Sequence, residues 1–521
     1  MNAMLPGRRW LAIALLLAPC IRAEAQLPPL GVPRGKLRVE LSGRFQDWNQ
    51  RFRDGDKEDA AADFIRGTAN AAWLPALGET EAVLARIVGA PTPGLSLGRS
   101  EAALLASAGA GGVGLAFGLT SRITLFGNVP FVRLRVQQTL GLDSTNANLG
   151  LNPAHPAFGT DAGRLQGVQL LNELSSVLAT LGTRIQSGDY DSDLALKALA
   201  QATLARGTAM RTDLDALFGE SATANPFLPV SGTPAAVTLA ETLDALRTTL
   251  ATSLQVPGFT AAAPLPTQRV SGAEFLRVVS GAGGPFAFRP LPSSIITAVG
   301  DAEVGAAFTW LEHRPGRGLA IRSVLQGTVR LPTGYLARSD ELLALSSGDR
   351  QLDLQGDLVT DLDAGRIGAR LTGRYVYQRP GRIDRRVRDP EQPIAVVSLL
   401  TQLERDPGEI IEGMVEPYVR IAPSLALVGG ARLWSKAEDR WTYAAGAPVI
   451  PGVEPQLLAR GSRERALALS GGVSFVHSGR RRDGTQGQPM EAGLRYEWVA
   501  ASSVGRVAAT RGVSILLRFY R

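Results

Sequence analysis

Charged side chains recur at alternate positions in the second half of the chain. The run 411–421 places Glu412 and Glu416 on one side of a strand and Val415 and Val419 on the other, because a period of two is the side-chain repeat of a β-strand. Opposite charges on facing strands pair with each other, and in an enclosed passage they select by charge. The candidates for this role are Arg322, Arg330, Asp353, Asp357, Arg370, Arg374, Glu412, Glu416, Arg432, Glu491 and Arg495.

Catalytic chemistry has little support in the sequence. There are 3 histidines, the usual general base: His155 lies in a long insertion, His313 in a predicted periplasmic turn and His477 at a predicted periplasmic strand end. The H-E-x-x-H and G-x-x-x-x-G-K-[ST] motifs are missing. The segment 347–357 has calcium-type spacing but lacks the twelfth-position Glu of an EF-hand loop. The sequence therefore predicts no catalytic residue, no metal site and no cofactor, with an outer-membrane hydrolase as a remaining alternative.

The alternating segments number about twelve, an even number as expected for a bacterial β-barrel. In one of them, 122–138, the apolar positions change from odd to even at Pro130, which predicts a β-bulge there. The strands are expected at 36–48, 103–119, 122–138, 301–312, 319–331, 352–361, 366–378, 411–421, 425–436, 467–475, 491–498 and 513–519.

The connections between these strands alternate between long and short. The long ones are 49–102, 139–298, 332–350, 379–408 and 437–464, and only the last two connections, 478–489 and 501–506, depart from the order. Outer-membrane barrels have short periplasmic turns and long outer loops, and closure leaves no free strand edge in lipid. We therefore expect apolar residues to face lipid and polar residues to face a lumen, the reverse of a soluble sandwich. A lumen crossed by charge pairs would be narrow or gated.

The long insertion 139–298 follows a helical period. Leu165, Val168, Leu171 and Leu174 recur at helical spacing, and 192–216 and 235–254 are also rich in Ala and Leu. The pattern predicts two to four amphipathic helices packed on one another. By the loop count they lie outside the cell or dip into the barrel as a plug.

The N-terminus reads as an export signal. Arg8 and Arg9 precede a short apolar run, and Ala23-Glu24-Ala25 fits a cleavage site, which makes 1–25 a signal peptide. Cys20 allows a lipoprotein as the alternative; cleavage after Ala25 leaves no cysteine and excludes disulfides and thiolate-bound metals. The net charge is +7, but the arginines are scattered and no nucleic-acid motif is present, so no nucleic-acid partner is expected.

Several motifs resemble one family of outer-membrane proteins. "VGDAEVGAAFTWLE" (299–312), "GTVRLPTG" (327–334), "SSGDRQLDLQGDLVTDL" (346–362) and "FGLTSRITLFGNVPFVR" (117–133) are similar to the putative MetA-pathway of phenol degradation family, a group of FadL-like "transporter" barrels. The resemblance covers about 103–138 and 299–521 and omits the helical insertion. It implies a channel for hydrophobic or aromatic compounds and no catalytic residues. The C-terminus, with Phe519 as its aromatic, resembles a signal for the barrel-assembly machinery.

Taken together, the residues predict an all-β transmembrane barrel of about twelve antiparallel strands, with a helical insertion between the third and fourth strands. The expected division is 1–25, 26–138 (first strands), 139–298 (insertion) and 299–521 (remaining strands). The expected function is passive uptake of a small, hydrophobic or aromatic solute across the outer membrane, with the lipid bilayer, the solute and the assembly machinery as partners. The main alternative is a non-conducting structural or adhesive barrel whose insertion binds a partner.

Overall fold

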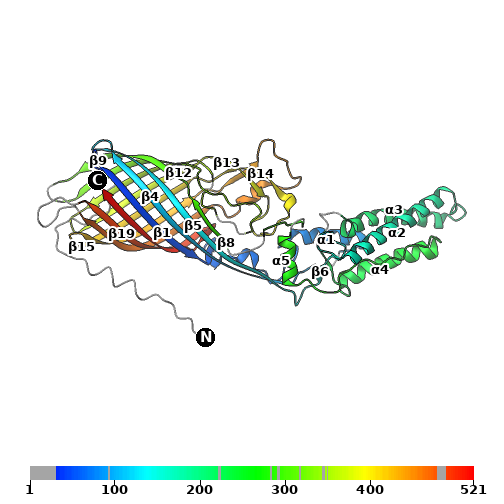
Figure 1. Cartoon of the computed structure of the whole chain (residues 1–521). Coiled ribbons are helices and arrows are strands. Elements are labelled where there is room, and N and C mark those ends of the chain that lie inside the picture. Colours follow the sequence, from blue (N-terminus) through cyan, green and yellow to red (C-terminus); the bar gives the residue numbers. More distant parts are fainter. Residues whose placement is uncertain are drawn as a thin grey trace, which may run out of the picture.

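The computed structural model describes residues 31–91, 94–220, 225–281, 284–289, 294–315, 318–342, 346–348, 350–477 and 488–521. The predicted signal peptide, 1–25, lies outside these residues. Their fold is a β-barrel, from one end of which a group of helices extends (Figure 1).

Twelve antiparallel strands close the barrel, as predicted. Each strand pairs with its neighbour in this order, and the first strand pairs with the last, so the wall has no free edge. The strands are β1 (Leu37–Trp48), β4 (Arg99–Gly118), β5 (Ile123–Asp143), β9 (Glu303–His313), β10 (Ala320–Arg330), β11 (Asp353–Asp363), β12 (Ile367–Gln378), β15 (Ile410–Ala422), β16 (Leu425–Lys436), β18 (Glu464–His477), β19 (Met490–Val504) and β21 (Arg511–Tyr520).

The predicted bulge at Pro130 is wrong. β5 keeps one continuous register with β4 along its whole length, and the register shift lies on its other side. There, β9 pairs with Ile123–Asn128 of β5, and β8 (Ser294–Val299) pairs with Phe131–Val136 of β5. The β8 pairing is shifted by one residue relative to the β9 pairing, so the extra residue belongs to the segment that joins β8 and β9. The apolar residues change parity because the surroundings of β5 change along its length. Before Pro130 in the sequence, the outward side of the strand meets lipid. After Pro130, the inward side is buried in protein.

Leu134 and Val136 show this inward burial, with exposed fractions of 6% and 3%. At the same level the outward positions are the exposed arginines Arg133 and Arg135. The strand therefore crosses from lipid into water near Phe131 without any irregularity in its backbone.

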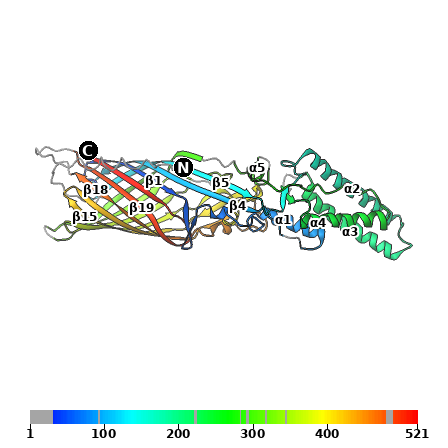
Figure 2. The same ribbon diagram turned by 90° about the horizontal axis from the view of Figure 1, so that it is seen from below.

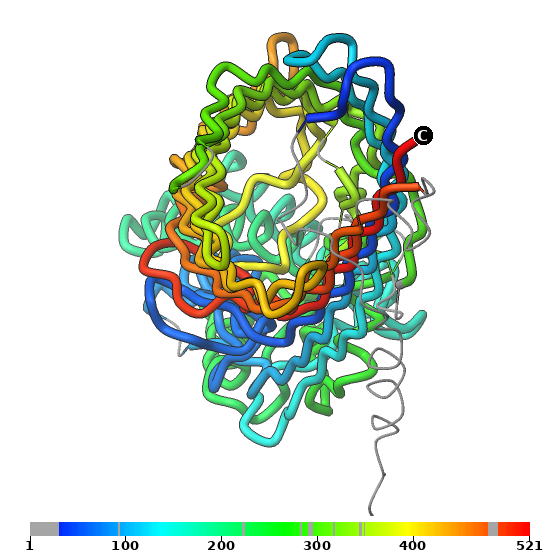
Figure 3. Tube along the Cα trace, turned by 90° about the vertical axis from the view of Figure 1, so that its left-hand side faces the viewer, coloured from blue at the N-terminus to red at the C-terminus, as the bar shows by residue number. Residues whose placement is uncertain are grey.

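Small sheets gather at the long-loop end of the barrel (Figure 1). Seen along the barrel, the connection between β12 and β15, which contains β13 and β14, lies across the opening (Figure 3), so the mouth is partly covered. These elements are β2 (Gln50–Arg53), β3 (Asp56–Asp59) and β20 (Arg506–Ala508); β13 (Gly381–Arg386), β14 (Leu400–Asp406) and β17 (Arg440–Tyr443); β6 (Leu149–Leu151) and β7 (Phe227–Pro229); and the short helices Ala62–Phe64, Val397–Leu399 and Pro455–Ala459.

The helices form one unit beyond the mouth rather than a plug inside the barrel (Figures 1 and 2). Its members are α1 (Pro75–Val88), α2 (Asp161–Gln186), α3 (Leu194–Phe218), α4 (Pro234–Thr248, continued by a π-helical turn Thr249–Ser253) and α5 (Gly272–Ser280). The insertion lies between the third and fourth barrel strands, as predicted. However, α1 comes from the loop after β1, which the sequence reading grouped with the first strands.

The helical unit has its own core. Fully buried leucines such as Leu84 of α1, Leu174 of α2, Leu214 of α3 and Leu239 of α4 belong to one cluster. The helix starts are capped locally: the Asp193 carboxylate accepts from two backbone amides, and Ser271 and Glu274 form a capping box. Among the residues that the structure describes, no helix is long and apolar enough to cross a membrane.

A charge network ties the first loop to the last hairpin at the mouth. The buried Asp63 carboxylate pairs with Arg51 at 2.7 Å, with Arg53, and with Arg506 at 3.3 Å. Burial alone would raise the pKa of Asp63, but the hydrogen bond and charge of Arg51 and the charges of Arg506 and Arg53 outweigh it and lower the pKa.

Because the pKa of Asp63 is lowered in the folded protein, the network contributes its full stability to the fold above the ordinary aspartate pKa, near 4. This contribution is lost as the pH falls through the lowered pKa of Asp63. We expect Asp63→Asn to open the network at neutral pH, so that the hydrogen-exchange protection factors of 50–59 and 506–508 fall, as they do in the wild type once the pH is below the lowered pKa of Asp63. Asp47→Asn, which breaks an exposed pair with Arg511, is the control and should change exchange little. Equal protection in Asp63→Asn and wild type would contradict this account.

Candidate functional site: the barrel lumen

The two faces of each barrel strand meet different surroundings. On β11, Asp353 and Asp357 are 1% and 4% exposed, whereas the alternate residues Leu354 and Leu358 are 45% and 44% exposed. Carboxylates on the inward face and leucines on the outward face are the arrangement of a transmembrane barrel. The exposed tryptophan and tyrosine side chains of β9 and β12 lie toward the ends of these strands, where membrane barrels carry their interfacial girdles: Trp310, Tyr375 and Tyr377.

Inward-facing charges form a ladder of ion pairs along the wall. Arg330 contacts Glu303 at 3.3 Å and Asp353 at 3.0 Å. Arg370 donates from two nitrogens to Asp361, at 2.6 and 3.0 Å. Strand parity predicts that the aspartates of β11 and the arginines of β12 share one face of this hairpin. The register agrees, since it pairs Asp361 with Arg370 and Asp357 with Arg374.

One chain of ion pairs continues across several strands. Arg374 contacts Asp357 at 2.7 Å and Glu412 at 3.6 Å. Glu412 contacts Arg432 at 3.4 Å, and Arg432 reaches Glu497 at 3.0 Å. Glu497 accepts in turn from Arg44 of β1 at 2.9 Å. The ladder therefore runs from β11 round to β1, and its charges largely neutralise one another.

Small residues on β18 let these pairs cross it. Arg432 of β16 and Glu497 of β19 are separated by β18, whose inward residues include Ala468 and Ser470. Arg495 of β19 reaches Glu416 of β15 in the same way, over both β16 and β18. A Cβ placed at Gly430 would lie 2.3 Å from the Ser470 hydroxyl, so a larger side chain there would require Ser470 to change its rotamer.

The two remaining predicted residues, Glu491 and Arg322, have different surroundings. Glu491 accepts from the Tyr520 hydroxyl at 2.5 Å and lies 3.7 Å from Arg518, which also contacts Glu40 at 2.6 Å. Arg322 makes no ion pair within the described part of the chain; its guanidinium lies beside Gly31 near the N-terminus. The structure therefore places Arg322 with the N-terminal segment.

The opposite wall is an apolar track. On β4 the inward residues from Leu104 to Gly118 are only leucine, alanine and glycine, and the paired inward residues of β5 carry no charge. Ala106 faces Val136, Ala110 faces Val132, and Gly112 faces Pro130 in register. The lumen is thus two-sided, with the ion-pair ladder on one wall and the apolar track on the other.

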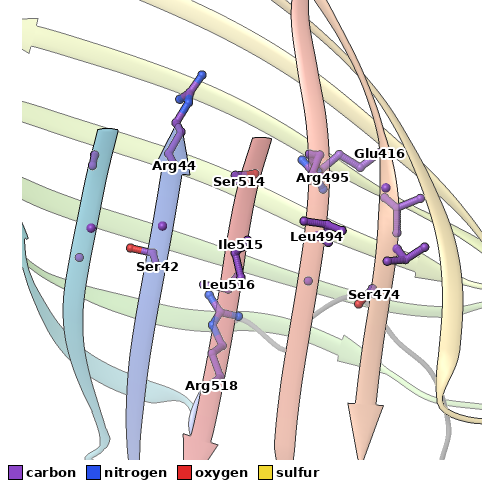
Figure 4. Close-up of a pocket in the computed structure, with 18 of the residues that line it drawn as sticks. Ser42, Arg44, Glu416, Ser474, Leu494, Arg495, Ser514, Ile515, Leu516 and Arg518 are labelled. Atoms are coloured by element: carbon purple, nitrogen blue, oxygen red, sulfur yellow. The ribbon is translucent and has the colours of Figure 1, made fainter. Parts of the chain in front are cut away.

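A cavity of about 410 Å³ lies where the two walls meet. Figure 4 shows Ser42 and Arg44 on β1, Ser514 and Arg518 on β21, and Arg495 beside Glu416 around it. Ala110, Gly112 and Pro130 line it from the apolar side. A small molecule in this cavity would meet hydroxyls and ion-paired arginines on one side and apolar surface on the other.

The three histidines of the chain lie apart from one another. His155 is buried in the helical unit, where its Nδ1 accepts from the amides of Ala157 and Phe158, while His313 and His477 end β9 and β18. Within the part of the chain that the structure describes, no group of three or more His, Cys, Asp or Glu could hold a metal ion.

The sequence reading passed over one motif, G-x-S-x-G at Gly94–Gly98. It lies in the loop before β4, and the Ser96 hydroxyl accepts from the Gly98 amide at 3.0 Å. A nucleophile elbow of this motif needs a strand-to-helix turn, which is not the context of Ser96.

The sequence reading also missed part of the ladder. Glu303, Glu497, Arg44, Glu40 and Arg518 all take part in it but were not among the candidates. The same parity rule would have found them: Glu40 and Arg44, for example, alternate with Leu41 and Phe45. Their partners lie far away in the sequence, so parity alone could not show the pairing.

No family model matches this chain, and no curated protein matches it. Among solved structures, it is similar to an outer-membrane channel from Pseudomonas putida F1 (10% identity, TM-score 0.41, covering 95% of this chain and 99% of that one). It is also similar to the CymD monoaromatic hydrocarbon channel (8%, 0.26, 94% and 88%). A third is the transport unit of the autotransporter AIDA-I from Escherichia coli (6%, 0.29, 95% and 92%).

These likenesses concern the barrel fold. Likeness at this level does not distinguish a channel from the other functions of such barrels. What this chain passes must be argued from its own lumen.

Proposed function

We propose that this protein is an outer-membrane channel through which a small hydrophobic or aromatic solute diffuses passively. The observation that carries the proposal is the two-sided lumen, in which an uncharged track on β4 and β5 runs beside the neutralised ladder. The export signal expected at 1–25, together with a barrel whose apolar side faces outward, supports the outer membrane as its location.

The two walls have different roles in this proposal. Ion-paired side chains hold one another in place, so the ladder narrows the lumen and fixes its width. Ions gain little from a wall whose charges are already paired, whereas an apolar solute loses little on leaving water for a track of alanine, valine and proline. The geometry therefore favours neutral or weakly polar solutes over free ions.

The loop asymmetry supports an orientation. Short turns join β4 to β5 and β11 to β12 at one end, and the helical unit lies at the other. In outer-membrane barrels the long loops are extracellular. In this orientation solutes enter beside the helical unit and leave near the N-terminus.

Narrowing the track tests the proposal. We expect Ala110→Phe, which adds a ring on the inward face of β4, to reduce severalfold the flux of benzyl alcohol into vesicles whose outer leaflet is lipopolysaccharide, a leaflet that apolar solutes cross slowly by themselves. Val113→Phe, on the outward and exposed face of the same strand, is the matched control and should leave flux unchanged. Wild-type protein that passes no more benzyl alcohol than the same lipopolysaccharide-coated vesicles without protein would overturn the proposed channel.

A further inference from the structure

A second cavity, of about 300 Å³, lies at the mouth of the barrel. One of its walls is apolar and comes from the inward ends of β1, β4 and β5 and from the adjoining loops: Trp48, Leu104, Ala106, Val136, Leu336 and Leu342. The other wall is the end of β13 and the residues after it, where Arg385, Arg386 and Arg388 line the cavity. The cavity thus has an apolar side and a guanidinium side.

Arg386 is a buried cation whose hydrogen-bond partners are all neutral. It is 4% exposed, and its Nη1 donates to the carbonyls of Phe286 at 2.5 Å and Ala395 at 2.6 Å. Its guanidinium lies over the Phe288 ring, 3.9 Å from the centroid, and its buried Nε has no hydrogen-bond partner. No carboxylate of the described residues lies within ion-pair distance of it.

Burial lowers the pKa of Arg386 to about 10, so the group keeps its charge at neutral pH. A buried charge without a counter-charge is costly. The carbonyls of Phe286 and Ala395 offset part of this cost, and an anion in the cavity would offset more.

Two further arginines reinforce the positive wall. Arg385 is exposed toward the cavity, with its guanidinium 5.7 Å from the Trp441 ring. Arg388 is half-buried, and its closest acceptor is the carbonyl of Gln392 at 3.4 Å. Burial, and then the charge of Arg385, lower the pKa of Arg388 to about 10. These groups repel one another, and a bound anion would relieve the repulsion.

The remaining charged groups around the cavity leave it positive. Arg338 is held by Asp340 at 3.1 Å, and Glu341 and Asp384 also line the cavity. Four guanidiniums therefore face two carboxylates on its surface.

We propose that this cavity binds a small amphipathic carboxylate, with its anionic group on Arg385, Arg386 and Arg388 and its apolar part against Leu104 and Val136. A simple anion would leave the apolar wall in contact with water. A hydrocarbon would leave the three guanidiniums without an ion-pair contact among the described residues, since Asp439, Asp340 and Asp63 act on them only at longer range. The volume suits a single ring or a short chain.

The cavity opens onto the apolar track. Ala106 of β4 and Val136 of β5 face each other in register and line this cavity. Ala110 and Pro130, further along the same two strands, line the 410 Å³ cavity in the lumen. A bound carboxylate would therefore hold its ring at the top of the track. The proposed function concerns the passage of neutral solutes through the lumen, and the binding of a carboxylate at the mouth does not depend on it.

The test compares benzoate with benzyl alcohol, which keeps the ring, and with acetate, which keeps the charge. In calorimetric titrations of the full-length barrel in detergent, we expect benzoate to bind at least roughly tenfold more tightly than either, because a charge-assisted contact and the burial of a ring each contribute more than about 1.4 kcal/mol. Acetate that binds as tightly as benzoate, or benzyl alcohol that does so, would overturn the amphipathic site.

Variants locate the binding. The double variant Arg385→Gln/Arg388→Gln should weaken benzoate binding roughly tenfold and leave the weak affinity for benzyl alcohol unchanged. Arg382→Gln removes a charge from the same strand outside the cavity and is the matched control. Arg385→Lys/Arg388→Lys keeps the charge and should retain most of the binding. Equal benzoate affinity in wild type and the glutamine variant would overturn the assignment.

Failure of this site and failure of the channel are distinguishable. Benzyl alcohol flux through Arg385→Gln/Arg388→Gln reports on the lumen, and benzoate titration reports on the cavity. Flux that persists without benzoate binding removes only the site, and binding without flux removes only the channel.

Discussion

Leu358→Arg should cost about 2–4 kcal/mol of folding free energy in lipid, the cost of an arginine on the lipid face of a barrel near the bilayer midplane. Leu358 lies at the middle of β11, on the outward face, and is 44% exposed. The loss should appear as a lower denaturant midpoint for folding into vesicles. It should also appear as a smaller fraction of barrels that keep their compact mobility on unheated gels.

The matched control for this change lies three residues away. Gln355 faces the lumen and donates to Asp357 at 2.8 Å, so Gln355→Arg introduces the same charge beside two carboxylates and should cost less than about 1 kcal/mol. If the two variants lost equal stability, or the lumen variant lost more, the outward face of β11 would not be meeting hydrocarbon.

Arg374→Glu should change the ion preference of the lumen more than any other single substitution in the ladder. Arg374 lies between Asp357 and Glu412, which are 4% and 8% exposed. Reversing its charge places three carboxylates together, with only Arg432 left beside Glu412, and the lumen should become selective for cations. In planar bilayers under a salt gradient, we expect the reversal potential to move toward that of a cation-selective pore and the conductance to change severalfold.

Breaking a buried pair also destabilises the barrel, by about 3–5 kcal/mol, so the measurement needs a variant that restores the pair. The exchange Arg374→Asp/Asp357→Arg keeps both charges while swapping their places, and it should return both the fold and the reversal potential toward wild type. Arg370→Glu, beside Asp361, should shift the potential in the same direction as Arg374→Glu. An unchanged potential in properly folded Arg374→Glu barrels would remove this residue from the ion pathway.

The barrel itself could be predicted because its evidence is local. Alternation along 352–361 or 411–421 already separates the two faces of a strand, and the sorting of long and short loops indicates closure. The positions of β11, β12, β15 and β16 agree with the predicted ranges to within two residues at each end. Helical spacing likewise placed the insertion between the third and fourth strands.

The partners of the charged residues could not be predicted in the same way. Parity shows that Arg432 faces inward, but its pairing with Glu497 depends on small residues of β18 that allow the contact. Arg322 obeys the same parity and lies instead beside Gly31. Which carboxylate an arginine reaches is set by strand order, side-chain length and the size of intervening residues.

The change of parity at Pro130 shows the same limit. A shift of the apolar positions by one is what a bulge produces, but β5 runs straight and its surroundings change from lipid to a protein interior. The sequence records which side of a strand is apolar and cannot record what that side touches.

By itself, the sequence determined the strands, their two faces, the sorting of the loops and the helical insertion, because each depends on residues that are neighbours in the chain. Only the tertiary structure decided that α1 joins the helical unit, that the lumen has a charged and an apolar wall, and that Arg386 lies buried at the mouth. These depend on contacts between segments up to hundreds of residues apart, which form only when the barrel closes.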